Sequence, residues 1–291
     1  MARLPEAHDL TVGFIGHGRA ARSLAGAFSR RGHTIVIAAR SASAATLAVE
    51  LGAEEASAAD ILASADATVL AVPDAAVAPL ARDLAADAAP GDGRLVVHLA
   101  GSLPASVLAP LAERGYAIAA VHPLQVLSGW RVAPGTAFAV DADERSAPLA
   151  SRLVGELGGV EFAVPASGRT AYHAAASLAA NLGMTLLAEA VDLMAAQGIP
   201  REEAMQGLGA LVRGGLEAAM DQGLPASLTG PVGRGDTATV AGHLDALAGD
   251  PELRRAYAAG SLLTLRQVLR QGRPAAAPAA VELRALLEGA L

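Results

Sequence analysis

The stretch TVGFIGHGRAARSLAGAF, residues 11–28, decides the fold of this chain. It opens with a short apolar run, continues through the turn Gly16-x-Gly18-x-x-Ala21, and ends in an alanine-rich stretch with helical periodicity. A second apolar run follows at His33–Ala39. A strand, a glycine-rich turn, a helix and another strand in this order are typical of the first unit of a doubly wound sheet.

Each small residue of the turn has a physical role in binding a dinucleotide. Gly16 permits the tight turn, Gly18 lets the backbone approach a pyrophosphate at the helix N-terminus, and Ala21 lets the helix pack close to the strand. A plain tight turn in an α/β protein is the alternative, but the position between strand and helix favours the dinucleotide. The residues expected against the cofactor here are Gly16, His17, Gly18, Arg19 and Ala20.

The end of the second strand indicates which dinucleotide is bound. NAD sites usually place an acidic residue there, where it takes the ribose 2′-hydroxyl. This chain has Arg40 at that point, followed by Ser41. A guanidinium and a hydroxyl suit a 2′-phosphate, so we expect NADP rather than NAD. The alternative is a solvated arginine at the edge of the sheet.

Apolar runs alternate with amphipathic stretches through the first half of the chain and give way to helices in the second half. The expected strands are Leu10–Ile15, His33–Ala39, Ala67–Val72, Arg94–Leu99 and Tyr116–Val121, with weaker ones at Thr136–Val140 and Val160–Val164. Helices are expected near 19–31, 43–51, 57–64, 74–88, 104–114 and 146–157, and then at 168–197, 201–222, 233–248, 251–271 and 278–290. The pattern predicts an α/β fold, with an N-terminal Rossmann doubly wound parallel sheet over residues 1–165 and an all-α C-terminal domain over 166–291.

Ligands of such sheets bind beyond the carboxyl ends of the strands, so the loops that follow the strands are candidate site segments. Val72, Pro73 and Gly101 are expected to border the cofactor. Ser102, His122 and Gln125 are candidates for the nicotinamide or substrate end. For His122, a loop histidine with a local hydrogen bond is an equally good interpretation.

The stretch RTAYHAAASLAAN, residues 169–181, carries Arg169, His173, Ser177 and Asn181 at steps of four in an otherwise apolar helix. Residues four apart lie nearly above one another on a helix, and each step turns the stripe by roughly 40°. We expect His173 and Asn181 to be catalytic and Ser177 to contact substrate on the wall of a wet cleft. Arg169 drifts off this face and is expected at the rim. A buried histidine bonded to backbone is the bland alternative.

Composition excludes several classes of function. The chain has 291 residues, of which 53% are hydrophobic, and it contains neither Cys nor Lys, so disulfides and thiolate metal sites are excluded; we expect no metal. The net charge of −7 argues against nucleic-acid binding. No signal peptide is evident, and we expect the uncharged run Thr170–Ala188 to be a buried helix of a soluble cytoplasmic protein rather than a membrane span.

Motifs spread over nearly the whole chain carry a resemblance to a known family: GFIGHGRAARSLA, VLAVPD, HLAGS, HPLQ, YHAAASLAANL and LTGPVGRGDTATVAGHL. They resemble a bacterial family of Rossmann-like NADP oxidoreductases whose C-terminal half is a domain of unknown function. That family is similar to pyrroline-5-carboxylate reductase, ketopantoate reductase and the 6-phosphogluconate dehydrogenase superfamily. The resemblance implies a reductase with a helical second domain that forms a homodimer through those helices, which also agrees with the scarcity of aromatics.

The loop SLTGPVGRGDT resembles the substrate-carboxylate loop of pyrroline-5-carboxylate reductase. The resemblance implies that Thr229, Arg234 and Thr237 bind substrate. A helix N-terminal loop capped by Asp236 or Thr237 is the alternative. Relatives often use a Lys and an Asn one turn apart in the long helix, and this chain has no Lys.

The function expected from these features is NADPH-dependent reduction of a small carboxylated ketone or imine, ketopantoate-like or pyrroline-carboxylate-like, in an interdomain cleft. His173 or His122 is expected to donate the proton, and Asn181 to orient the acceptor. The missing Lys keeps a second hypothesis open, in which the protein is a non-catalytic dinucleotide-binding sensor.

Overall fold

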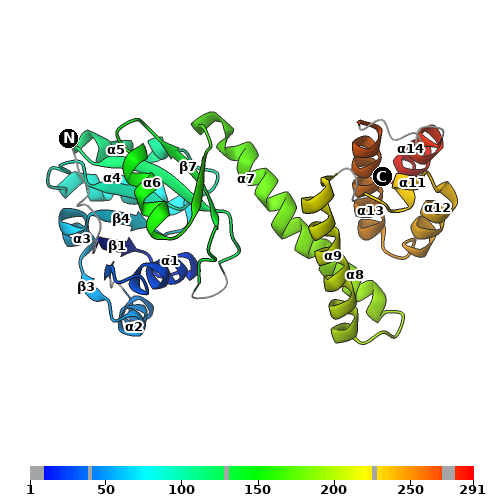
Figure 1. Ribbon diagram of the computed structural model, residues 1–291, viewed down its shortest axis with the longest axis horizontal. Helices are drawn as coiled ribbons and strands as arrows, with labels where there is room; N and C mark the ends of the chain where they lie inside the picture. The colour runs from blue at the N-terminus through cyan, green and yellow to red at the C-terminus, as the bar shows by residue number, and fades with distance from the viewer. Residues whose placement is uncertain (1–9, 39–40, 128–130, 225–227, 271–278) are drawn as a thin grey trace. The chain divides into compact units, whose positions relative to one another are not determined.

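The computed structural model describes residues 10–38, 41–127, 131–224, 228–270 and 279–291 (Figure 1). Contacts divide the chain into two compact units, Met1–Asn181 and Leu182–Leu291. All strands of the described residues lie in the first unit, and the described residues of the second unit form helices and their connections. The predicted class, a Rossmann-like α/β domain followed by helices, is confirmed.

One sheet of eight strands forms the centre of the first unit, in the order β3-β2-β1-β4-β5-β6-β7-β8. The strands are β1 (Thr11–Ile15), β2 (Thr34–Ala38), β3 (Glu54–Ala56), β4 (Ala67–Leu70), β5 (Leu95–His98), β6 (Ala117–Pro123), β7 (Ala137–Ala142) and β8 (Val160–Ala163). β1 pairs with β2 on one side and with β4 on the other. The strand order therefore reverses at β1, which is the topological switch point of the sheet.

The sheet is parallel, as predicted, except at one pair of strands. β7 runs antiparallel to β6, whereas β8 runs parallel to β7. Only a crossover lets a following strand run parallel, and a direct return makes the next strand antiparallel. The described part of the 124–136 connection contains no helix to provide that crossover.

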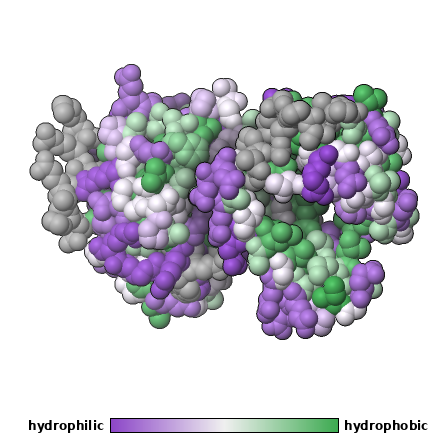
Figure 2. All heavy atoms as spheres, turned by 45° about the vertical axis from the view of Figure 1, so that its right-hand side comes forward, coloured by the Kyte–Doolittle hydropathy of each residue, from purple (hydrophilic) through white to green (hydrophobic). Residues whose placement is uncertain are grey.

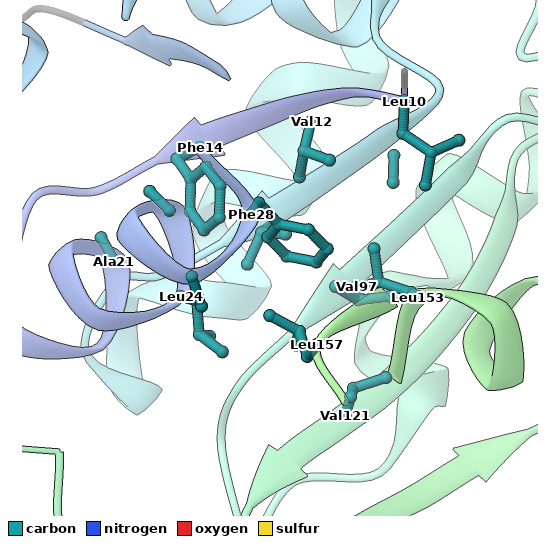
Figure 3. Close-up of a cluster of buried hydrophobic side chains, with 14 of the residues drawn as sticks. Leu10, Val12, Phe14, Ala21, Leu24, Phe28, Val97, Val121, Leu153 and Leu157 are labelled. Carbon is teal, nitrogen blue, oxygen red and sulfur yellow. The ribbon is translucent and has the colours of Figure 1, made fainter. Parts of the chain in front are cut away.

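Helices cover both faces of the sheet because successive strand residues point to opposite sides and most of these residues are apolar. The helices of the first unit are α1 (Arg19–Ser29), α2 (Ala42–Leu51), α3 (Ala58–Ser64), α4 (Asp74–Asp87), α5 (Ala109–Glu113), α6 (Ala147–Glu156) and α7 (Arg169–Ser177). Side chains of α1, α2 and α6 share one buried cluster, and those of α3, α4 and α5 share another on the opposite face. In Figure 3, Phe28 of α1 and Leu153 of α6 point into the first cluster beside Val97 of β5.

The second unit is built from α8 (Gly183–Ala195), α9 (Arg201–Gln222), α11 (Pro231–Arg234), α12 (Thr237–Ala246), α13 (Pro251–Arg270) and α14 (Ala280–Glu288). Apolar residues of the last four helices form one small core, with Val240, Leu265 and Leu283 fully buried. The single helix expected at 233–248 is wrong: Gly235 adopts φ +77°, which ends α11, and Asp236 caps α12. The hairpin of α8 and α9 forms a separate pair of packed helices.

The helical stretch from Arg169 to Ala195 is one run in which a π-turn, Leu178–Leu182, joins α7 to α8. The division between the two units falls within this run, after Asn181. The start of α7 is anchored in the first unit by the hydrogen bond from Arg169 to the carbonyl of Ala100. The expectation that Thr170–Ala188 is buried is wrong, since most of these residues are exposed in the chain on its own. By length and composition alone, Ala166–Ala195 could cross a membrane, and only 6% of its most apolar window is buried.

We predict that Gly13→Ala destabilises the first unit. A Cβ atom on Gly13 of β1 would lie 2.1 Å from Cγ2 of Ile61 and 3.3 Å from Cβ of Ala65, so α3 would have to move off the sheet. Overpacking of this kind costs about 1–3 kcal/mol in free energy of unfolding, measurable by urea denaturation. Gly214→Ala in α9 is the control: its Cβ meets nothing within 4 Å, and it should leave stability unchanged or raise it by up to about 1 kcal/mol. Equal losses in the two variants would contradict the prediction.

Candidate active site

The glycine-rich turn lies at the carboxyl end of β1, where the strand order of the sheet reverses. Gly16 has φ +123°, and a Cβ there would lie 2.2 Å from the carbonyl oxygen of Ala71, so the position requires glycine. Gly18 is the N-cap of α1, makes no side-chain capping bond, and has open space where a Cβ would be. The first amides of α1 therefore face an open, exposed turn and can donate hydrogen bonds to an anion.

The other residues predicted to hold a cofactor surround this turn or lie at the same edge of the sheet. His17 and Arg19 are exposed, and Ala21 is fully buried against the sheet as its predicted role requires. Ser41 is exposed and caps α2 by accepting a hydrogen bond from the amide of Ala44 at 3.3 Å. The predicted phosphate-binding Arg40 lies outside the described residues.

A cleft of about 640 Å³, which we call the α7 cleft, opens at the carboxyl end of β6 in the first unit. Its walls are formed by the end of β6 and the loop that follows it, by β8, and by α7 with its π-turn. Its lining residues are His122, Pro123, Leu124, Gln125, Val126, Phe162, Tyr172, His173, Ala175, Ala176, Ser177, Ala179, Ala180 and Asn181. It thus brings together five residues predicted separately from the sequence: His122, Gln125, His173, Ser177 and Asn181.

The π-turn keeps the polar stripe of the long helix on one wall. An α-helix overshoots one turn by roughly 40° at each step of four residues. The wider π-turn holds more residues per turn, so the step from Ser177 to Asn181 no longer overshoots. His173, Ser177 and Asn181 accordingly all line the α7 cleft. Single π-turns inside α-helices occur frequently at functional sites.

His122 is held in the cleft by aromatic neighbours. Its Nδ1 lies 2.7 Å from the hydroxyl of Tyr172, and its ring makes edge contacts with the rings of Tyr172 and His173. Burial, reinforced by the charges of His173 and Arg169, lowers the pKa of His122 to about 4. At neutral pH the imidazole is therefore uncharged, and it is a hydrogen-bonding partner rather than an imidazolium acid.

Gly101 is the point where both histidines reach the backbone. A Cβ on Gly101 would lie 2.3 Å from Nδ1 of His173 and 3.0 Å from Nε2 of His122. The close approach explains why glycine stands at this position. Nδ1 of His173 is buried against this loop and has no hydrogen-bond partner within the described part of the chain.

Arg169 is completely buried, so the prediction that it lies at the rim is wrong. Its Nη2 donates a hydrogen bond to the carbonyl of Ala100 at 3.0 Å, which anchors α7 to the loop after β5. Nε and Nη1 find no partner among the residues that the structure describes. Burial lowers the pKa of this guanidinium, with Asp141 and Tyr172 opposing the shift.

His98 extends this network, and sequence reasoning did not select it. The amide of Ala100 donates to its Nδ1 at 3.2 Å, so Nε2 carries the proton and donates to the carbonyl of Pro104 at 3.1 Å. Burial lowers the pKa of His98 to about 4, so it stays neutral. Together, His98 and Arg169 fix the backbone of the loop that contains Gly101.

Two predicted substrate residues of the first unit are already engaged in local hydrogen bonds. Ser102 donates to Asp74 at 3.3 Å and does not line the α7 cleft. Gln125 lines the cleft, but its amide oxygen accepts from the amide of Ala133 and its amide nitrogen donates to the carbonyl of Arg131. Gln125 therefore stabilises the connection between β6 and β7.

The predicted carboxylate loop lies in the second unit and makes local contacts. Arg234 donates to the carbonyl of Thr229 at 2.7 Å. Thr237 is the first residue of α12, and Asp236 caps that helix by accepting from the amide of Thr239 at 3.1 Å. These are the contacts expected of a helix N-terminal loop, the alternative raised by the sequence.

Tyr172 and Phe162 are the functional candidates that the sequence did not reveal. Tyr172 lies within the alanine-rich stretch one residue before His173, but it is outside the four-residue stripe. Phe162 belongs to a strand whose pairing fixes its position beside the cleft. The signal that could have found Tyr172 is that a tyrosine hydroxyl near a buried wall needs a polar partner.

Comparisons with known proteins agree with this architecture. Residues 4–123 match the Rossmann-like domain family, and residues 136–264 match DUF2520, a domain family of unknown function. No curated protein matches the chain.

Several solved structures share the fold. A candidate NADP oxidoreductase from Bacteroides fragilis is 24% identical with a TM-score of 0.72, over 89% of this chain and 98% of that one. A reductive aminase from Aspergillus terreus, in complex with NADPH and ethyl levulinate, is 19% identical with a TM-score of 0.64, over 97% and 99%. A pyrroline-5-carboxylate reductase from Coxiella burnetii is 17% identical with a TM-score of 0.60, over 90% and 98%.

At these identities the solved structures are evidence for the fold alone, and the family matches carry the assignment. The Rossmann-like match spans the strands that build the glycine-rich turn, and the DUF2520 match begins just before β7 and includes all of α7. The chain thus matches a Rossmann-like domain in its first part and DUF2520 in its second, the pairing that its motifs predict.

Proposed function

We propose that the protein is an NADPH-dependent oxidoreductase that reduces a carbonyl or imine carbon bound in the α7 cleft. The observation that carries the proposal is the position of two features at the same edge of one sheet. The open glycine-rich turn follows β1, and the cleft with its histidines follows β6. A dinucleotide that lies along this edge spans from a phosphate site to a reaction site in folds of this type.

NADPH fits the residues that line this edge. Backbone amides from Gly16 to Ala20 would hold the pyrophosphate, because the space beside Gly18 is open and no acidic side chain stands in the first turn of α1. Arg40 and Ser41 would take the 2′-phosphate, Val72 and Pro73 would border the adenine half, and Gly101 would border the nicotinamide. When bound, NADPH supplies a hydride. The NADPH complex of the Aspergillus terreus enzyme, which has the same fold, supports this choice.

The residues around the reaction site would position an acceptor in a largely apolar cleft. Asn181, Ser177 and His173 offer polar groups on the α7 wall. The remaining lining is largely alanine, leucine, valine and phenylalanine. An apolar cleft with a few convergent polar groups is the usual form of a small-molecule site.

We keep the proposal that the substrate carries a carboxylate, as the resemblance implies. The described lining of the α7 cleft contains no arginine. A carboxylate in this cleft would therefore be held by backbone amides. Thr229, Arg234 and Thr237, which the resemblance assigns to a carboxylate, belong to the second unit, and the guanidinium of Arg234 has donors beyond the one that contacts the carbonyl of Thr229.

We further propose that two copies form a homodimer, soluble and cytoplasmic, through α8 and α9. Leu187 and Val191 of α8 are buried, whereas Leu186 and Leu193 on the opposite side of that helix are exposed. A helix that is apolar on both sides is covered on both sides in a stable protein. In Figure 2, hydrophobic residues gather over this part of the surface, at the lower right.

The exposed face of α9 continues this surface. Met205, Val212, Leu216 and Met220 are exposed and recur at the spacing of a single helical stripe. A second copy of the same face is the partner that fits, because an isologous interface pairs like with like. A bilayer fits poorly, since α9 also carries charged residues such as Arg213 and Glu217 and the described residues contain one span-like helix.

The substrate class can be tested by following NADPH oxidation with a panel of keto acids, the corresponding methyl esters, and cyclic imino acids. We expect turnover with NADPH to exceed turnover with NADH, and the acids to be preferred over their esters. A preference for the esters would reject the carboxylate while leaving the reductase. Tight NADPH binding with no turnover of any compound would favour the dinucleotide-binding sensor.

Gly18→Asp should weaken NADPH binding without harming the fold. An Asp is a favourable N-cap, so the free energy of unfolding should stay level or rise. Its carboxylate would, however, stand where the pyrophosphate is held, and affinity should fall at least about tenfold, or about 1.4 kcal/mol. Gly230→Asp is the matched control, because Gly230 is also an N-cap glycine whose Cβ would meet nothing within 4 Å, and it should leave NADPH affinity unchanged. Binding can be followed by NADPH fluorescence, and unchanged affinity in the Asp variant would count against the cofactor site.

Placing two charges on the α9 stripe should separate the proposed dimer. We expect the parent protein to sediment as a dimer and the double variant Val212→Glu, Leu216→Glu to sediment as a monomer, because two carboxylates would be desolvated in each copy. Val281→Glu in α14 introduces the same charge at another exposed valine and should leave the dimer intact. A monomeric parent protein would refute this interface.

A further inference from the structure

Tyr172 occupies a fixed position on the wall of the α7 cleft. Its ring lies between two others, with the centroid of Phe162 at 5.9 Å and that of His122 at 5.6 Å. Its hydroxyl is 2.7 Å from Nδ1 of His122, and both residues line the cleft. Packing on one side and a hydrogen bond on the other therefore set the direction of the hydroxyl.

The hydrogen bond between Tyr172 and His122 can run in either direction. A neutral imidazole carries one proton, on Nδ1 or on Nε2. When the proton is on Nδ1, His122 donates to the tyrosine oxygen, and the hydroxyl proton of Tyr172 is free to point into the cleft. Burial raises the pKa of Tyr172, so the hydroxyl keeps its proton at neutral pH.

We propose that Tyr172 is the proton donor of the reaction, held in place by His122, and that the substrate it serves is a ketone or aldehyde. This inference rests on the proposed reductase function. In the reaction that bound NADPH supports, the hydride brings both electrons of the new C–H bond, the π pair of the carbonyl moves onto oxygen, and NADP⁺ is left. The oxygen takes the proton of Tyr172, so the product is an alcohol.

The arrangement suits this proton transfer at both stages. Before transfer, Nδ1–H of His122 leaves the tyrosine proton for the substrate. After transfer, the same N–H donates to the negative phenolate oxygen, and a charge-assisted hydrogen bond of this kind is about twice as strong as a neutral one. Water in the open cleft then returns the proton to the phenolate. Tyr172 is thus the catalytic residue, and His122 is a positioning residue.

An iminium substrate would make no use of this donor. Hydride addition to a positively charged C=N bond gives a neutral amine directly, and no proton is needed at that step. A carbonyl oxygen, in contrast, becomes an alkoxide unless it is protonated. The Tyr172 hydroxyl therefore distinguishes the two substrate classes that the proposed function leaves open.

Tyr172→Phe tests the donor. Loss of one general acid typically lowers the rate by about 10²–10⁴-fold, so we expect ketone reduction to fall by at least about 100-fold in kcat. KM for the ketone and NADPH affinity should stay within a few-fold, and any reduction of a preformed cyclic iminium should be spared. Tyr257→Phe is the control, because Tyr257 pairs with His243 at 2.8 Å in the same edge geometry, outside the cleft. It should leave ketone reduction unchanged.

Two substitutions of His122 test the positioning role. The amide of His122→Asn reaches about as far as Nδ1 and can replace the bond to Tyr172, whereas the amide of His122→Gln reaches towards Nε2. We expect Asn to retain most ketone reduction and Gln to lose it. The proposal would be overturned if both His122 variants lost ketone reduction to the same extent while Tyr172→Phe lost none.

A readout without turnover keeps the two proposals separate. In the cofactor-free protein, the nitrogen chemical shifts of the His122 ring report its tautomer, and Tyr172→Phe should change them. Unchanged shifts would mean that the hydrogen bond is absent and would overturn the donor. A wild-type protein that reduces imines but no ketone would also overturn the donor while the reductase function stands. A protein that reduces neither ketones nor imines would overturn both the donor and the reductase function.

Discussion

Close approach of backbone to its neighbours at the carboxyl edge of the sheet is the constraint on which the rest of the site depends. A Cβ on Gly16 would lie 2.2 Å from the carbonyl oxygen of Ala71. A Cβ on Gly101 would collide with the rings of His122 and His173. Neither position tolerates a Cβ without backbone movement. The close packing at this edge therefore depends on two residues that lack a side chain.

Arg169 is what keeps this edge in place, and it does so at a cost. A buried cation without a carboxylate partner is expensive, and here its one described hydrogen bond goes to a neutral carbonyl. In return, the loop after β5 is fixed. Burial keeps His98 and His122 neutral, and the charge of Arg169 adds to that effect. The interior beneath the cleft thus contains one permanent charge and two uncharged rings.

The sequence was sufficient for most of the fold because its signals are local. Seven strands and the glycine-rich turn follow from apolar runs and spacing, and the polar stripe from His173 to Asn181 follows from helical periodicity. β3 escaped prediction because Glu54 and Glu55 give a short edge strand no apolar pattern. The depth of Arg169 and the pairing of Tyr172 with His122 escaped because they depend on which loop packs against α7. Such contacts are set by the folded sheet and have no local signature in the chain.

The wall that α7 and its π-turn present to the cleft is made largely of alanines: Ala175, Ala176, Ala179 and Ala180. Alanine is the best helix former, and each of these positions contributes a single methyl group to the lining. Exchange for valine or leucine would fill part of the 640 Å³ while the helical backbone stays the same. The shape of the bound molecule is therefore set by single codons along one helix, and a lineage can change its substrate range there without rebuilding the groups that perform the chemistry.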